Sequence, residues 1–115
     1  MELKQLVELC HNALDAMKAE NIITIDVTGR SAMNDVLVFA TGISTRHVKS
    51  LAISLNADAK KAGIEPFGIE GADEGQWALV DLGDVVVHIM LPDVRDFYQL
   101  ERLWQNNDAV DTETA

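Results

Sequence analysis

The residues of this chain best suited to chemistry are an acid and an imidazole that share one segment, residues 77–91. Gly83 and Asp84 divide the segment into two apolar runs. Glycine followed by a small polar residue is typical of a two-residue hairpin turn, because glycine adopts a positive φ at little steric cost. Since side chains alternate along each strand, Asp81 and His88 then lie on the same face of the hairpin.

The hairpin sorts its side chains into two unlike faces. One face is apolar throughout and predicts a core face, whereas the second combines apolar bulk with the acid and the imidazole. A shift of one residue would scramble this sorting, which favours the register that pairs Trp77 with Met90. We therefore expect function on the second face, called the mixed face below. The mixed face carries Trp77, Leu79, Asp81, Val86, His88 and Met90, and the core face carries Ala78, Val80, Leu82, Val85, Val87 and Ile89.

Enzymatic chemistry is tested from the same residues. A nucleotidyltransferase needs a Gly-Ser pair near a helix start for phosphate, then two or three carboxylates for Mg²⁺. Gly42 and Ser44 fit the first requirement, but the run at 66–69 offers no paired acids. Asp81 and Asp84 flank a turn and are not aimed together, and the three histidines lack zinc-ligand spacing. We expect no catalytic, cofactor-binding or metal residues, and a nucleotidyltransferase-like enzyme stays open as an alternative.

The elements that position the mixed face follow from hydrophobic periodicity. Apolar residues recur at helical spacing in two long segments, and the second begins after Ser44, a good N-cap, and stops at Gly63. The first two strands are close enough in sequence for an antiparallel pair, and the helical crossover after them allows a parallel pair, so we expect a mixed sheet. The predicted elements are a helix at 2–19, strands at 22–27 and 36–40, a helix from Ser44 to Gly63, an edge strand at 66–69, the hairpin, and a helix from Pro92 with Asp93 as its cap and Phe97, Leu100 and Trp104 on its inner face.

Length and composition fit one domain. The chain has 115 residues, of which 48% are hydrophobic, and a single cysteine, Cys10, on the buried stripe of the first helix. We expect an α/β fold with a mixed β-sheet of about five strands flanked by helices over residues 1–104, and a flexible acidic tail at 105–115. The sequence has neither a signal-peptide pattern nor an apolar run long enough for a membrane span, so a cytoplasmic location is expected.

The charge is strongly acidic and unevenly distributed. The formal net charge is −10, and residues 62–94 contain no Lys or Arg. Such a surface repels nucleic-acid phosphates and attracts a basic protein surface. We expect neither nucleic-acid recognition nor membrane binding, and a purely solubilising role of the acids stays open.

Four short motifs in a fixed order carry a resemblance. They are Thr41-Gly-Ile-Ser-Thr-Arg-His-Val48, Gly68-Ile-Glu-Gly71, Trp77…Asp81-Leu-Gly-Asp84…His88, and Phe97-Tyr-Gln-Leu-Glu-Arg-Leu-Trp104. From about Leu3 to Trp104 the chain resembles the ribosomal silencing factor family, also called Iojap-related. The resemblance implies a nucleotidyltransferase-like fold without the catalytic acids. It also implies a translational repressor that binds the large ribosomal subunit through protein fourteen of its subunit-joining face and blocks the small subunit during starvation.

The resemblance and the charge together predict partner binding on the mixed face. Trp77 and Met90 would supply contact area, acids would meet cations of the partner, and His88 and Tyr98 would form hydrogen bonds at the edge. Three alternatives stay open: Trp77 as a core residue under a helix, His88 as a core imidazole bonded to Asp81 or to backbone, and an acidic module that forms a homodimer. The predicted partner-binding residues are Glu70, Asp73, Trp77, Asp81, Asp84, His88, Met90 and Tyr98.

Overall fold

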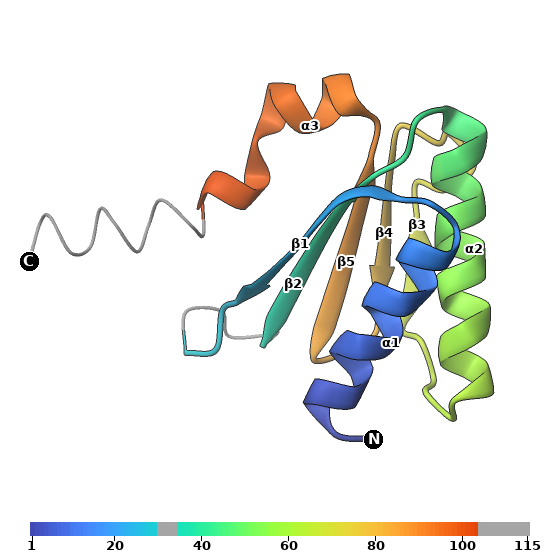
Figure 1. Ribbon diagram of the computed structural model, residues 1–115, viewed down its shortest axis with the longest axis vertical. Coiled ribbons are helices and arrows are strands. Elements are labelled where there is room, and N and C mark those ends of the chain that lie inside the picture. The colour runs from blue at the N-terminus through green and yellow to red at the C-terminus, as the bar shows by residue number, and fades with distance from the viewer. Residues whose placement is uncertain (30–34, 104–115) are drawn as a thin grey trace, which may run out of the picture.

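The structure, a computed structural model, describes residues 1–29 and 35–103. Two long helices pack across one face of a five-stranded sheet, and a short third helix lies at one end of the other face (Figure 1). This arrangement confirms the expected α/β class. The elements in chain order are α1 (Leu3–Ala16), β1 (Glu20–Asp26), β2 (Val36–Thr41), α2 (Thr45–Lys61), β3 (Gly68–Glu70), β4 (Trp77–Asp81), β5 (Val85–Met90) and α3 (Pro92–Tyr98).

The sheet is mixed, as predicted, with strand order β1-β2-β5-β4-β3. β1 and β2 are antiparallel, β2 and β5 are parallel, and β4 is antiparallel to both of its neighbours. β2 is buried along its whole length, which agrees with its continuous apolar run. β3 lies at an edge as expected, but it spans Gly68–Glu70 rather than residues 66–69.

The hairpin has the predicted register. Trp77 pairs with Met90, and each following pair agrees down to Asp81 with Val86. The backbone N–H of Leu82 donates to the carbonyl of Val85 at 2.9 Å and closes the two-residue turn. Gly83 has a φ of +91°, which explains why glycine suits this position.

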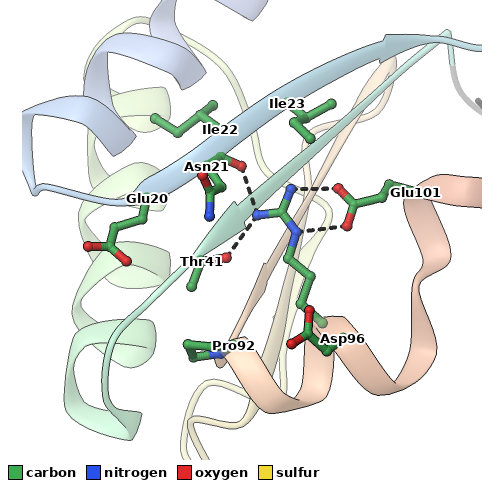
Figure 2. Close-up of a pocket in the computed structure, with 9 residues that line it drawn as sticks. Glu20, Asn21, Ile22, Ile23, Thr41, Pro92, Asp96 and Glu101 are labelled. Atoms are coloured by element: carbon green, nitrogen blue, oxygen red, sulfur yellow. Dashed lines mark hydrogen bonds and ion pairs between the residues drawn. The ribbon is translucent and has the colours of Figure 1, made fainter.

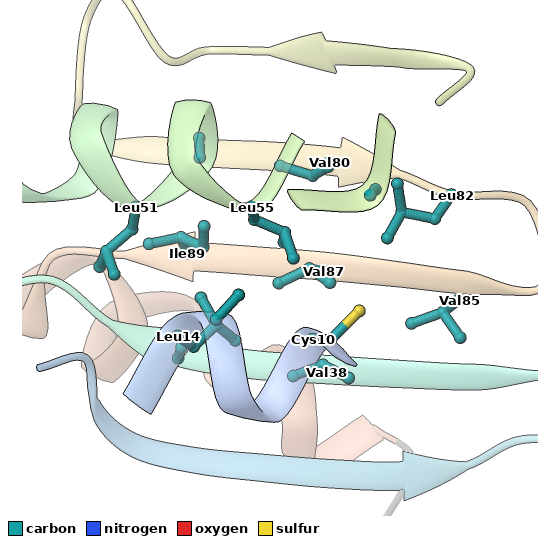
Figure 3. Packing of buried hydrophobic residues seen from close by; sticks show 14 of the residues in the cluster. Cys10, Leu14, Val38, Leu51, Leu55, Val80, Leu82, Val85, Val87 and Ile89 are labelled. Carbon is teal, nitrogen blue, oxygen red and sulfur yellow. The ribbon is translucent and has the colours of Figure 1, made fainter. Parts of the chain in front are cut away.

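The core face of the hairpin packs under the two long helices (Figure 3). Leu14 of α1 and Leu51 of α2 are fully buried against this side of the sheet. Cys10 is also fully buried, and burial raises the pKa of its thiol to about 12. The thiol therefore stays protonated and serves as a small core residue, as expected.

The opposite face has a smaller hydrophobic cluster. Its buried members come from β1, β2 and β5 and from the residue that follows β1, while half-buried side chains from β4 and from the α3 region pack at its border. This is the mixed face, and it has less helical cover than the core face. The buried members are Ile25, Val27, Leu37, Phe39, Val86 and Met90.

The helix boundaries confirm two predictions and correct two. The hydroxyl oxygen of Ser44 accepts a hydrogen bond from the N–H of His47 at 3.1 Å, and Gly63 has a φ of +86°, so both ends of α2 follow the prediction. α1 ends at Ala16 instead of residue 19, because the chain turns through Lys18 with a φ of +64°. The predicted cap of α3, Asp93, is wrong. Leu91 is the N-cap, and Asp93 lies in the first turn.

The prediction for the inner face of the third helix is also partly wrong. Phe97 was predicted to face inward, yet it is 80% exposed. The helix ends at Tyr98, because Gln99 adopts the left-handed conformation with a φ of +47° and redirects the chain. Leu100 packs against the small cluster, as predicted, and Val94 packs there as well. Trp104 and the tail at 105–115 lie outside the described residues.

Candidate partner-binding surface

Five aromatic or imidazole rings form a continuous group on the mixed face. His88 stacks on Phe39 with ring centroids 5.0 Å apart, and Trp77 lies 6.0 Å from His88. Tyr98 then contacts Trp77 at 5.1 Å, and Phe97 contacts Tyr98 edge-on at 4.9 Å. We call these five residues the aromatic surface. It runs from β2 across β5 and β4 to the end of α3, so one sheet and one helix position it.

The exposure of these rings increases toward α3. Phe39 is buried, Trp77 and His88 are half-buried, and Tyr98 and Phe97 are 52% and 80% exposed. Trp77 therefore lies partly in the small cluster and partly at the surface. Large exposed apolar side chains that group together are typical of an interaction site.

Within residues 1–29 and 35–103, His88 has one hydrogen-bond partner, Trp77. Its Nδ1 accepts from the indole N–H of Trp77 at 3.1 Å. Burial lowers the pKa of His88 from 6.5 to about 4, so the imidazole is neutral near pH 7. The alternative in which His88 bonds to Asp81 is wrong. Trp77 and His88 are diagonal neighbours across the hairpin. Long side chains at diagonal positions are close enough to interact, so the predicted register could have identified this bond.

The structure places Met90 differently from the other predicted contact residues. Its side chain has no exposed surface and belongs to the small cluster beneath the aromatic surface. The prediction that Met90 contacts a partner directly is therefore wrong. Met90 instead supports the aromatic surface from below.

Two predicted acids share the mixed face and two do not. Glu70 pairs with Leu79 across β3 and β4, so both side chains point to the same side, and Glu70 is exposed. Asp81 also belongs to this face, and its carboxylate accepts from the N–H of Gly83 at 2.9 Å. Asp73 lies 3.4 Å from the Nζ of Lys49 on α2, the helix that covers the opposite face.

Asp84 lies in the hairpin turn, at the end of β5 that is remote from Trp77. Its side chain is exposed, and its backbone carbonyl accepts from the N–H groups of Asp35 and Val36. With a strand rise of about 3.4 Å per residue, the turn is roughly 20 Å from Trp77. Trp77, His88 and Tyr98 are thus assembled into one site with Glu70 and Asp81 near it, while Asp73 and Asp84 lie elsewhere.

A buried arginine that the sequence prediction missed holds the α3 region in place. Arg95 is only 7% exposed, and Glu101 accepts hydrogen bonds from its Nε at 2.8 Å and its Nη2 at 2.5 Å (Figure 2). Its Nη1 donates to the carbonyl of Asn21 at 2.7 Å and to the hydroxyl of Thr41 at 2.8 Å. These four bonds join the chain after α3 to the ends of β1 and β2.

The Arg95 group borders an open pocket of about 580 Å³. No periodic signal marks Arg95 and Glu101 as partners, because they are six residues apart and α3 ends between them. The pocket is lined by Glu20, Asn21, Ile22, Ile23, Thr41, Pro92, Arg95, Asp96 and Glu101.

The residues considered for metal or phosphate chemistry have structural roles. Within residues 1–29 and 35–103, no three His, Cys, Asp or Glu side chains are grouped so that they could hold a metal ion. Ser44 is engaged in capping α2. Gly42 is required by a close approach, since a Cβ at this position would lie 2.6 Å from Cγ2 of Val48. In the same described ranges, no helix has both the length and the apolar character needed to cross a membrane.

A mixed sheet with helices across one face and a partly exposed aromatic surface on the other defines a small α/β protein with an interface-like surface. Comparison with known proteins then identifies its family. The family model described as "Ribosomal silencing factor during starvation" matches residues 1–115, and the chain belongs to this family. The resemblance carried by the four sequence motifs is therefore confirmed.

Relatives and solved structures agree with this assignment. Ribosomal silencing factor RsfS of Haemophilus influenzae is 46% identical over 99 residues, which cover 86% of this chain and 97% of that protein. The mouse protein named "Mitochondrial assembly of ribosomal large subunit protein 1" is 35% identical over 85% of this chain and 44% of its own length. A crystal structure of a protein from Chromobacterium violaceum matches with a TM-score of 0.90 and 44% identity, covering 91% of this chain and 88% of that one.

Proposed function

We propose that this protein is a translational repressor that binds the large ribosomal subunit at its subunit-joining face and prevents association with the small subunit during starvation. Membership of the ribosomal silencing factor family supports the regulatory role. The name of the mouse relative refers to the large subunit and supports the choice of subunit. A factor of this kind acts in the cytoplasm, where it meets ribosomes, and needs no catalytic step.

The aromatic surface is the observation that carries the proposal. Trp and Tyr side chains are enriched among residues that dominate binding energy. Here the sheet positions Trp77, and α3, which carries Arg95 of the buried ion pair with Glu101, positions Tyr98. We assign Trp77, Tyr98 and His88 to the centre of the interface. Glu70 and Asp81 on the same face would meet cationic side chains of the partner.

The proposed partner on the large subunit is its protein fourteen. Ribosomal proteins carry basic surfaces because they pack against RNA phosphates. An acidic chain with a net charge of −10 is attracted to such a surface over long distances. The same aromatic surface would also be the contact in a homodimer, so ribosome binding and self-association would compete.

Co-sedimentation with isolated subunits tests the proposal. The wild-type chain should travel with the large subunit and not with the small one, and Trp77→Ala should reduce its recovery. Ile53→Ala is a matched control, because Ile53 is 50% exposed on α2 and faces away from the mixed face. Equal recovery with both subunits, or recovery with neither, would contradict the proposed function.

A further inference from the structure

The hydrogen bond between Trp77 and His88 fixes where the imidazole carries its proton. An indole nitrogen can only donate, so Nδ1 of His88 must be the acceptor and must be unprotonated. In a neutral imidazole the single proton then resides on Nε2. The lowered pKa of His88, caused by burial, is consistent with a ring that stays neutral at physiological pH.

The Nε2–H group of His88 is left available at the surface. The bond from Trp77 is the one hydrogen bond that His88 makes to the described residues. No buried side-chain nitrogen or oxygen among these residues lacks a partner, so Nε2 reaches solvent. The aromatic surface therefore has a polar donor at its half-buried centre.

The ring is also held against rotation. It stacks on Phe39 with an interplanar angle of 10°, and a flip about the Cβ–Cγ bond would break the hydrogen bond from Trp77. A donor that is fixed in position and protonation state can discriminate between partner groups. An N–H donor opposite Nε2 would leave both groups unsatisfied, which is costly in a desolvated interface.

We infer that the aromatic surface is built to accept a neutral hydrogen-bond acceptor, a backbone carbonyl oxygen of the bound protein, on Nε2 of His88. This inference rests on the proposed function and specifies the group that the partner must present. A carboxylate of the partner would be repelled by Glu70 and Asp81 on the same face and by the net charge of −10 of the whole chain. A carbonyl oxygen accepts the bond without that repulsion.

Two amide variants separate the roles of the two ring nitrogens. The amide nitrogen of glutamine reaches approximately the place of Nε2, whereas the shorter amide of asparagine lies near Nδ1. We expect His88→Gln to bind the large subunit within about threefold of wild type and His88→Asn to bind about tenfold more weakly, because the latter leaves the partner's acceptor unpaired. Thermal melting of both variants should show that each is folded.

Nitrogen NMR of the free protein gives an independent test of the donor. His88 should appear as the neutral form with its proton on Nε2, and Trp77→Phe, which removes the indole N–H, should allow both tautomers. A proton on Nδ1 in the wild-type chain would overturn the inference. Equal losses of affinity in His88→Asn and His88→Gln, or no loss in either, would overturn it while leaving the proposed function intact. Failure of the wild-type chain to bind the large subunit would instead contradict the proposed function and, with it, the ribosomal acceptor.

Discussion

Replacement of Glu101 by Gln should release the α3 region from the sheet without unfolding the rest of the protein. The carboxylate of Glu101 accepts two hydrogen bonds from Arg95, and the side chain of Glu101 is only 13% exposed. An amide has one acceptor oxygen and no charge, so one guanidinium nitrogen would lose its partner. The arginine would remain largely buried without a counter-ion.

Two typical magnitudes bound the free-energy cost of Glu101→Gln. Removing one partner of a fully buried ion pair costs about 3–5 kcal/mol, and a hydrogen bond to a charged group contributes about 1.5–3 kcal/mol. Here the pair borders an open pocket, so water can replace part of the lost interaction. Arg95 also keeps its bonds to Asn21 and Thr41. We therefore expect a loss of about 1.5–3 kcal/mol.

The loss should be local, because the larger core lies on the opposite face of the sheet under α1 and α2. About 1.4 kcal/mol corresponds to a tenfold change in an opening equilibrium, so amide exchange in α3 should accelerate by roughly 10- to 100-fold. The N–H groups of Arg95 and Gln99, which donate to the carbonyls of Leu91 and Arg95, are suitable reporters. Hydrogen–deuterium exchange measured in α2 should stay unchanged.

Arg102→Gln is the matched control on the same segment. Arg102 donates to the side-chain oxygen of Gln99 at 2.6 Å, but this bond is exposed and should contribute little. Unchanged exchange in α3 of Glu101→Gln, or equal acceleration in α2, would refute the role of this ion pair as a local clamp.

Three further predictions concern the partner-binding surface. Trp77→Ala should cost about 2–4 kcal/mol of binding free energy, mainly through faster dissociation in a kinetic assay, while circular dichroism stays native. Loss of fold with full binding by the remaining folded fraction would place Trp77 in the core alone. Glu70→Gln should slow association and flatten its salt dependence. Asp73→Asn should change the association rate less, because the carboxylate of Asp73 lies beside Lys49 on α2. A larger effect of Asp73→Asn than of Glu70→Gln would contradict the assignment of Glu70 to the binding surface. His88 has a pKa of about 4 when folded against 6.5 otherwise, so its contribution to stability should be complete above about pH 6.5 and should fall by at most about 3 kcal/mol toward pH 4. Denaturant midpoints in His88→Gln should show a flatter pH dependence over that range.

The hairpin was predictable because its signal is local and redundant. Two strands of alternating side chains and a glycine turn have only one register that keeps an apolar face intact, and the structure has that register. The buried β2 strand was likewise evident from its composition. In both cases the deciding contacts join residues whose sequence pattern already restricts the options.

The Arg95 group could not be predicted in the same way. Arg95 bonds to the carbonyl of Asn21, 74 residues earlier in the chain, and no periodicity connects them. The overlong third helix has a related cause. The spacing of Phe97 and Leu100 fits a helix, but the left-handed Gln99 ends it, and glutamine carries no general signal for that conformation.

Dimensions and charge explain why the mixed face is open and which partner suits it. A seven-residue helix such as α3 is about 10 Å long, whereas the six-residue strand β5 extends about 20 Å, so α3 cannot cover the hairpin from end to end. What remains is a half-exposed aromatic surface with carboxylates on the same face. Two copies that met through this face would each bring a net charge of −10 to the contact. A basic partner neutralises that charge, so electrostatics favours a basic protein surface over a second copy of the chain.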